Sequence, residues 1–273
     1  MDMKNKTCLI TGANSGIGLE TARGLAATGS QVIMVCRDRH KGEAARADII
    51  ASTANEKVDL LIANLADLSS VRHLVDTVKS NYNRLHVLIN NACLMTKQRE
   101  VSQDGHELQF AVHHLATFVL TEGLLELLKS SAPARIINVT SMLHKFGRLN
   151  FDDLQGEKKF SSLGAYGQSK LAMLHYTYDL AEKLLGSGVT VNALHPGAVA
   201  TNIGFPSWMS MFLASPEKGA RTSLYLATSP EVADISGKYF INCKSVKSSK
   251  ASYNREEGQH LWEITAKLAA RSI

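Results

Sequence analysis

The chain has 273 residues, of which 45% are hydrophobic and 20% are charged. These proportions exclude a disordered or low-complexity chain, and the length fits one α/β domain better than two domains. The formal net charge is only +5, and the single basic run, KSVKSSK at 244–250, has no interleaved aromatic residues, so we expect no nucleic-acid partner.

The cysteines and the start of the chain suggest where the protein works. The four cysteines are Cys8, Cys36, Cys93 and Cys243. They form no C-x-x-C pair and have no histidine at metal-ligand spacing, so we expect reduced thiols and no metal site. An apolar segment begins a few residues after Met1 without room for a signal peptide, and we find no run of eighteen apolar residues. We therefore expect a cytoplasmic protein with no integral membrane segment.

Short strand-like segments alternate with longer helix-like segments along the whole chain. The predicted strands are 8–10, 31–36, 58–63, 86–91, 134–141, 189–195 and 238–242. The predicted helices are 16–28, 39–53, 68–82, 105–130, 162–186 and 216–228. This alternation predicts an α/β fold in a single domain, 1–273: a Rossmann-type, doubly wound, seven-stranded parallel sheet with helices on both faces. Irregular connections at 142–161 and 205–215 follow predicted strands, where loops overhang a ligand crevice.

The segment TGANSGIG at 11–18 follows the first predicted strand and opens the first predicted helix. Its small residues let the backbone turn sharply and approach a pyrophosphate at a helix N-terminus. A glycine triplet alone also occurs in ordinary tight turns, but a strand before it and a helix after it favour a dinucleotide-binding loop. The cofactor contacts predicted here are Gly12, Asn14, Ser15, Gly16, Ile17 and Gly18.

The residue that follows the second predicted strand is Arg37, nineteen residues past Gly18. An NAD enzyme usually has an acidic residue at this position, which binds the ribose 2′-hydroxyl. A guanidinium group instead binds a phosphate through two hydrogen bonds. We therefore expect NADP(H) rather than NAD(H), the alternative being a solvated arginine at the end of a strand.

Tyr166 and Lys170 stand four residues apart near the start of the helix predicted over 162–186, so they share one helix face. A free phenol has a pKa near 10, and acid/base work at neutral pH requires nearby positive charge to lower it. Lys170 and an oxidised nicotinamide are the candidate sources. A Y-x-x-x-K pair alone is often an exposed helix pair, but its place after the fifth predicted strand favours a site.

Together these motifs resemble the short-chain dehydrogenase/reductase family, most closely its retinol dehydrogenase-like branch. The resemblance extends over nearly the whole chain. It rests on TGANSGIG at 11–18, CRD at 36–38, ADLSSVR at 66–72, INNA at 89–92, ARIINVTS at 134–141, FDDLQGEKKF at 151–160, AYGQSK at 165–170 and LHPGAVAT at 194–201. It implies that Ser141 hydrogen-bonds the substrate oxygen, Tyr166 transfers a proton and Lys170 holds the nicotinamide ribose. The further cofactor contacts that it implies are Asn64, Leu65, Asn91, Ala92, Pro196, Gly197, Val199 and Thr201.

Three positions depart from the pattern of that family. Asn64 stands where an acidic residue beside the adenine is usual, and Cys93 stands where a glycine is usual. A packed, inert Cys93 is favoured over a reactive one. His113 stands where the family has an asparagine, its fourth catalytic residue, which holds a water in the proton relay behind the lysine. A histidine there either takes over the relay, since it titrates near neutrality, or is a packed residue.

The substrate is expected to contact the loops 94–99, 142–149 and 204–213, which follow strands. A substrate flap at about 202–215 carries aromatic and methionine side chains that either close over an apolar substrate or pack against the core. The predicted substrate contacts are Met95, Leu143, Phe205 and Trp208. We expect a small hydrophobic carbonyl or alcohol substrate.

The sequence predicts an NADP(H)-dependent oxidoreductase and leaves two alternatives. One is a nucleotide-binding sensor or partner-binding protein whose redox activity is impaired, motivated by the three departures. The other is a non-redox enzyme on the same scaffold, because a fold does not fix a function. A homodimer is possible through the apolar faces of the helices around 115–128 and 171–185.

Overall fold

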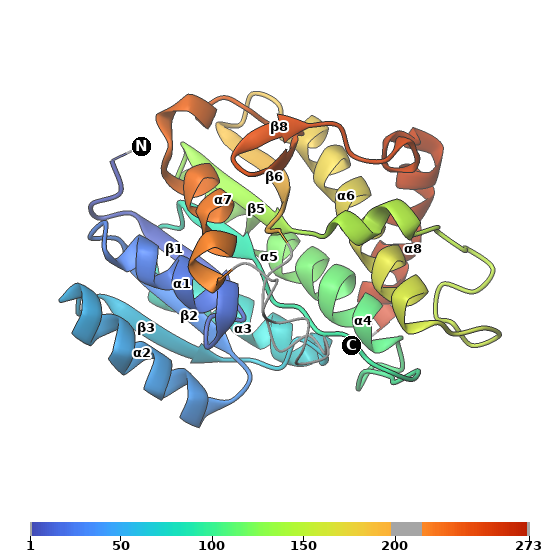
Figure 1. The fold of residues 1–273 in the computed structure, drawn as a ribbon, viewed down its shortest axis with the longest axis horizontal. Coiled ribbons are helices and arrows are strands. Elements are labelled where there is room, and N and C mark those ends of the chain that lie inside the picture. The colour runs from blue at the N-terminus through green and yellow to red at the C-terminus, as the bar shows by residue number, and fades with distance from the viewer. Residues whose placement is uncertain (1, 198–214, 272–273) are drawn as a thin grey trace.

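The computed structural model describes residues 2–197 and 215–271, and within these residues eight strands form one sheet (Figure 1). The strands are β1 (Thr7–Thr11), β2 (Gln31–Cys36), β3 (Val58–Ile62), β4 (Val87–Asn90), β5 (Ala134–Val139), β6 (Val189–His195), β7 (Tyr239–Ile241) and β8 (Lys244–Val246). Their order is β3-β2-β1-β4-β5-β6-β7-β8. The first seven pair in parallel, as predicted, and the central strands are continuous apolar runs because helices cover both of their faces.

The eighth strand, β8, was not predicted. It pairs with β7 in antiparallel orientation at the edge of the sheet. Its three residues are exposed and belong to the basic run at 244–250, so they show no alternation of apolar and polar side chains. A short edge strand that carries lysine is a usual way to end a sheet without exposing an adhesive edge.

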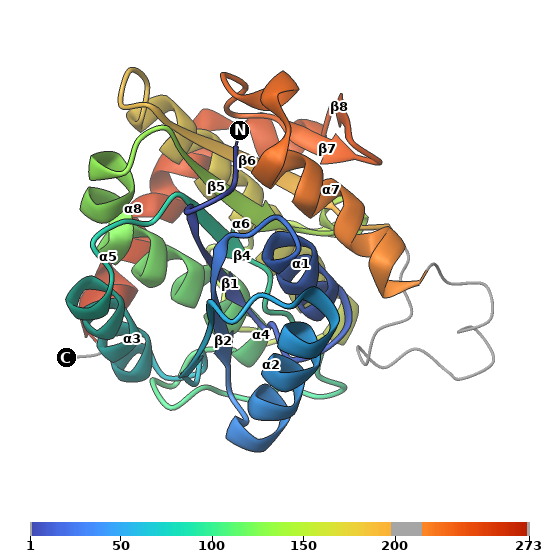
Figure 2. The same cartoon turned by 90° about the vertical axis from the view of Figure 1, so that its left-hand side faces the viewer.

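Helices cover the two faces of the sheet in separate layers (Figure 2). One layer contains α1 (Gly16–Ala26), α2 (Arg39–Thr53) and α7 (Pro216–Thr228). The other contains α3 (Leu68–Asn81), α4 (Leu108–Phe110), α5 (Ala116–Ser130), α6 (Ser162–Lys183) and α8 (Arg255–Arg271). Shorter helical turns are η1 (Ala111–Leu115), η2 (Met142–Phe146), η4 (Pro230–Val232) and η5 (Lys250–Tyr253).

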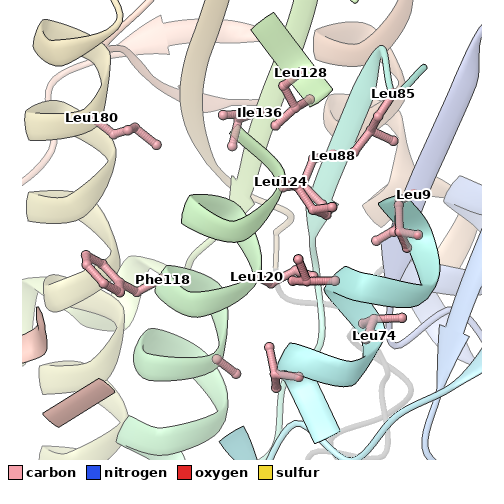
Figure 3. Close-up of a cluster of buried hydrophobic side chains, with 14 of the residues drawn as sticks. Leu9, Leu74, Leu85, Leu88, Phe118, Leu120, Leu124, Leu128, Ile136 and Leu180 are labelled. Atoms are coloured by element: carbon pink, nitrogen blue, oxygen red, sulfur yellow. The ribbon is translucent and has the colours of Figure 1, made fainter. Parts of the chain in front are cut away.

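Each face of the sheet has its own hydrophobic core, because neighbouring residues of a strand point to opposite faces. Leu9 belongs to a core under α3, α5 and α6 that also contains Leu74, Leu124 and Leu180 (Figure 3). The next residue, Ile10, packs on the opposite face among side chains of α1, α2 and α7. The two cores hold the sheet rigid, so the loops at its carboxyl edge project from a fixed base.

The helical stretch Leu108–Ser130 changes its hydrogen-bonding pattern in the middle. Residues 111–115 form a π-helical segment, η1, in which the Ala116 N–H donates to the carbonyl oxygen of Ala111. Such segments occur mostly as single turns within α-helices, often at functional sites. His113 lies at the centre of this segment, where the sequence predicted an uninterrupted helix.

The same stretch has the length and apolar composition of a membrane span, and it is the one such helix in the described part of the chain. Within the fold it packs against α3 and α6, and 67% of its most apolar window is buried. A core helix has the same composition, so this stretch is weak evidence for a membrane span.

The C-terminal helix α8, also not predicted, packs against α6. Trp262 of α8 contacts the rings of Phe118 on α5 and Tyr176 on α6, with ring centroids 5.2 and 5.5 Å apart. Part of the apolar surface on α5 and α6 is therefore covered within the chain. Whether these helices also join two copies stays a prediction.

Candidate active site

A cleft of about 470 Å³ opens where the order of the sheet reverses, at the carboxyl ends of β1 and β4. Ligands of doubly wound sheets bind at such a switch point. The lining residues that the sequence predicted are Gly12, Asn14, Ser15, Gly16, Ile17, Gly18, Arg37, Asn64, Leu65, Asn91, Ala92, Met95, Tyr166, Lys170 and Pro196. The predicted phosphate turn, adenine end and catalytic helix thus meet in one cleft.

The glycine turn leaves no room for side chains. Gly12 and Gly16 have φ angles of +66° and +54°, a region that favours glycine. A Cβ atom on Gly18 would lie 2.1 Å from the carbonyl oxygen of Gly12. The turn is braced from β4, because the Asn91 side-chain amide donates to the carbonyl oxygen of Thr11 at 2.8 Å, and the Thr11 hydroxyl accepts from the Ala92 N–H at 3.0 Å.

The N-terminus of α1 points its first N–H groups toward this turn. Ser15 occupies the N-cap position, but its side chain makes no capping hydrogen bond. In contrast, Asp38 caps α2, Asp67 caps α3 and Ser161 caps α6. Uncapped N–H groups and the positive end of the helix dipole favour an anion. The glycine turn and α1 therefore fit the pyrophosphate of a dinucleotide.

Arg37 and Asn64 lie at the adenine end of the cleft. Arg37 is exposed, and its guanidinium has no carboxylate partner among the described residues, because Asp38 pairs with Lys41 and Arg39 with Glu43. The side-chain oxygen of Asn64 accepts from the Ala66 N–H at 3.1 Å. The Asn64 amide group keeps its two N–H donors for a ligand.

Tyr166 and Lys170 line the other end of the cleft, and Ser141 contacts Tyr166 from outside the lining, next to Thr140. Ser141 follows β5 and caps η2, where its hydroxyl oxygen accepts from the Leu143 N–H at 3.2 Å, so its proton stays available for another acceptor. Tyr166 and Lys170 lie one turn apart on α6, and the Lys170 ammonium sits 5.6 Å from the centre of the Tyr166 ring. The same ammonium donates to the carbonyl oxygen of Val139 at 3.1 Å.

Burial shifts the pKa values of Tyr166 and Lys170. It raises the pKa of Tyr166 well above 10; the neighbouring Cys93 raises that pKa further, whereas a hydrogen bond with Ser141 lowers it. Burial lowers the pKa of Lys170 from 10.5, and Cys93 opposes this change. Without further positive charge in the cleft, Tyr166 is therefore a neutral phenol at neutral pH.

His113 is fully buried, and both of its ring nitrogens are hydrogen-bonded within the protein. Nε2 accepts from the Leu94 N–H at 3.1 Å, and Nδ1 lies 2.8 Å from the Ser169 hydroxyl. Burial and, secondarily, the charge of Lys170 hold the pKa of His113 well below 6.5. The His113 ring is therefore neutral at physiological pH. These surroundings favour a packed, hydrogen-bonded ring over a proton relay in which His113 changes its charge.

Cys93 and Met95 line the cleft beside these residues. The Cys93 sulfur lies 3.3 Å from the Tyr166 hydroxyl oxygen, so the thiol that the sequence favoured as inert touches the predicted acid/base. Leu143 is half-buried on η2, outside the lining of the cleft. Gly197 has a φ of +94° just after Pro196. Val199, Thr201, Phe205 and Trp208, with most of the predicted flap, lie outside the described residues.

Cys93, which the sequence analysis named as a departure, and Leu94, the first residue of the predicted substrate loop 94–99, also line the cleft. The lining residues that sequence reasoning did not single out are Val35, Cys36, Ala63, Ala66, Val112, Val139, Thr140 and Pro216. Several of them end a strand or follow one directly, so the predicted strand ends could have indicated them. Val112 carried no such signal, because the π-helical segment that contains it has no sequence pattern we could recognise.

The amino-acid sequence of this chain is similar to those of known dehydrogenases. The profile of the short chain dehydrogenases matches residues 6–208. The chain is 42% identical to retinol dehydrogenase 12 of Mus musculus, over 98% of this chain and 87% of that protein. It is likewise 42% identical to retinol dehydrogenase 13 of Homo sapiens, over 96% of this chain and 84% of that protein.

Solved structures have the same fold. A protein from Mycobacterium paratuberculosis superimposes with a TM-score of 0.83 at 34% identity, over 98% of this chain and 95% of that one. A short chain dehydrogenase from Escherichia coli CFT073, solved in complex with NADPH, gives a TM-score of 0.75 at 26% identity, over 89% of this chain and 99% of that one.

Proposed function

The chain belongs to the short chain dehydrogenase family, in its retinol dehydrogenase-like branch, and from this we propose that it is an NADP(H)-dependent reductase or dehydrogenase of hydrophobic carbonyls and alcohols. Membership makes it an oxidoreductase that acts on alcohol or carbonyl groups with a nicotinamide cofactor. The preference for NADP(H), the class of substrate and the roles of individual residues are the proposal. The grouping of Ser141 and Lys170 around Tyr166, which lines the cleft, supports it.

In the proposed reaction the protein holds the substrate oxygen and moves a proton at the Tyr166 hydroxyl. The bound nicotinamide supplies or accepts the hydride. Ser141 donates a hydrogen bond to the substrate oxygen, since its own oxygen already accepts from Leu143. During reduction Tyr166 gives its proton to that oxygen, and the nearby Lys170 ammonium stabilises the phenolate that remains.

The preference for NADP(H) rests on Arg37. Its exposed guanidinium lines the adenine end of the cleft and has no carboxylate partner in the described chain. A second, open hollow beside it is lined by Asn14, Arg37, Asp38, Arg39, His40 and Lys41. Four of these six side chains are basic, so the hollow favours the two negative charges of a 2′-phosphate over a 2′-hydroxyl.

The apolar character of the substrate is supported by the two elements that carry Ser141 and Tyr166. Met142 and Phe146 of η2 are 43% and 71% exposed, and Leu163, three residues before Tyr166 on α6, is 46% exposed. Exposed apolar side chains on elements next to a site can contact an apolar ligand. Met95, also apolar, lines the cleft itself.

The experiment that tests the proposal incubates the purified protein with NADPH and a panel of aliphatic and aromatic aldehydes and ketones, and follows the absorbance of the reduced cofactor. Tyr166→Phe is the matched control, because it removes the transferable proton but keeps the ring. We expect it to abolish turnover while NADPH binding stays nearly intact, whereas Lys170→Ala weakens both. Cofactor binding without oxidation of NADPH on any substrate would instead favour a redox-impaired binding protein.

Two further expectations from the sequence stay predictions: a cytoplasmic location, and the possible homodimer. Cell fractionation tests the first. Light scattering or sedimentation of the purified chain tests the second, since a dimer has twice the mass of 29.7 kDa.

A further inference from the structure

Tyr166 contacts two side chains, Cys93 in the connection from β4 to α4 and His113 in η1. The Cys93 sulfur is 3.3 Å from its hydroxyl oxygen. The ring of His113 meets the Tyr166 ring edge-on, with centroids 5.4 Å apart and an interplanar angle of 80°. Neither side chain has a part in the proposed proton transfer, yet both contact the group that performs it.

The hydrogen bonds of His113 determine its tautomer. Because the Leu94 N–H donates to Nε2, that nitrogen carries no proton. The proton of the neutral ring is then on Nδ1, which donates to the Ser169 hydroxyl, and this hydroxyl in turn donates to the carbonyl oxygen of Tyr166 at 2.8 Å. One imidazole thus connects the loop after β4 to the backbone of the residue that carries the phenol.

We propose that His113 is a positioning residue: through Leu94 it holds the loop that presents the Cys93 thiol to the Tyr166 hydroxyl, and through Ser169 it holds the backbone of Tyr166 itself. This inference deepens the proposed function, and its effect on turnover rests on that function. Cys93 and Leu94 line the cofactor cleft, so a shift of this loop changes the shape of the site at the proton-transferring group.

The physical reason is that the contacts of His113 lie away from bulk solvent: the one with Ser169 is buried and the one with Leu94 is part-buried. An N–H that loses its partner in such a position must open toward water or stay unpaired, and both are unfavourable. The Leu94 N–H has no backbone acceptor in a strand or helix, since residues 91–96 form no regular element. His113 therefore holds this segment at Leu94, while Thr11 holds its start at Asn91 and Ala92.

Two amide substitutions separate the two contacts of the imidazole. The side-chain amide of asparagine reaches the position of Nδ1 but not that of Nε2, so His113→Asn keeps a partner for Ser169 and loses the one for Leu94. Glutamine reaches the position of Nε2, so His113→Gln keeps an acceptor for the Leu94 N–H. Both substituents are neutral and can donate and accept hydrogen bonds.

The Cys93 thiol reports on the loop without requiring turnover. Cys8 and Cys36 are buried, and Cys243 is the other half-buried cysteine, so a Cys243→Ser background leaves Cys93 as the accessible thiol. In this background the rate of alkylation by iodoacetamide is measured for the parent, His113→Asn and His113→Gln. A Cys93→Ala protein verifies that the label is on Cys93.

We expect alkylation to be about tenfold faster in His113→Asn, as loss of one buried hydrogen bond favours local opening, and nearly unchanged in His113→Gln. We expect kcat with NADPH to fall in His113→Asn by about tenfold, while the Kd of NADPH changes by less than about threefold. His114→Asn is the control. It removes a buried histidine of the same segment that contacts Thr265 of α8 instead of Tyr166, so it changes stability alone.

Equal alkylation rates in the Asn and Gln variants would overturn the proposal, because the ring would then act only by filling space. Faster alkylation in His114→Asn as well would also overturn it, since the effect would be general loosening. If alkylation follows the expected pattern but no protein turns over any substrate, the hold on the loop stands and the proposed reaction fails.

Discussion

Replacing Arg37 with alanine tests the origin of cofactor preference most directly. The guanidinium is exposed at the end of β2, and within the described residues no carboxylate competes for it. The neighbouring Asp38 does not pair with Arg37, because its carboxylate caps α2 and accepts from the Lys41 N–H at 3.0 Å. Arg37→Ala therefore removes the proposed partner of the 2′-phosphate and leaves the capped helix in place.

The size of the effect follows from the type of contact. A hydrogen bond between charged groups contributes about 1.5–3 kcal/mol, which corresponds to a change of roughly 10- to 150-fold in Kd. Because the site is exposed and screened by salt, we expect the lower part of this range at physiological ionic strength. The affinity for NADH, which has no 2′-phosphate, should change less than about twofold.

The assay is titration of NADPH and NADH by the fluorescence of the bound nicotinamide, for the parent protein and for Arg37→Ala. Arg39→Ala is the matched control, since Arg39 is an arginine two residues further on, at the start of α2, and pairs with Glu43. The NADPH preference should fall at least about fivefold in Arg37→Ala and less in Arg39→Ala. Equal binding of the two cofactors by the parent, or an unchanged preference in Arg37→Ala, would refute the reasoning.

Three further predictions follow from the site and its supports. The pKa of Tyr166 is raised well above 10 in the free protein. The initial rate of reduction, which uses the phenol, should therefore stay constant from about pH 6 to 9, whereas the initial rate of oxidation, which needs the phenolate, should rise with pH. The opposite trends would contradict this assignment. Burial raises the pKa of Asp179 from 3.8 to about 6, so deprotonation of this carboxyl lowers the stability of the folded state as pH rises from about 4 to 6. Asp179→Asn should therefore have a higher melting temperature than the parent at pH 7 and the same melting temperature at pH 4. A lower melting temperature of the variant at pH 7 would contradict the direction of this effect. Phe146→Ser, at a side chain that is 71% exposed, should lower kcat/KM for apolar substrates with little change in stability, and equal loss on small polar carbonyls would argue against an apolar contact.

Much of the fold was predictable because its signals are local. The seven parallel strands are rich in apolar residues, although β3 contains Asp59 and β6 contains Asn192, and most crossover helices begin near a recognisable turn or capping residue. β8 was not predictable, since its three exposed residues carry no alternation. α8 was missed although its buried Leu261 faces the core, because most of the residues around it are polar and no strand follows.

The candidate site was predictable residue by residue where one motif supplies neighbouring groups. The glycine turn and the Tyr166–Lys170 pair are of this kind, and both line the cleft. What the sequence left open for His113 depended on contacts across the fold. Its partners lie at Leu94 and Ser169, 19 and 56 residues away, and the π-helical segment that orients the ring has no sequence signature we could use.

The position of Cys93 connects these observations. From the sequence, Cys93 was interpreted as an isolated thiol. In the structure its sulfur contacts the Tyr166 hydroxyl, and the next residue, Leu94, is hydrogen-bonded to His113. Two side chains that depart from the family pattern thus meet around the same phenol. Residues in contact change each other's effects, so substitutions at 93 and 113 should not add when they are combined.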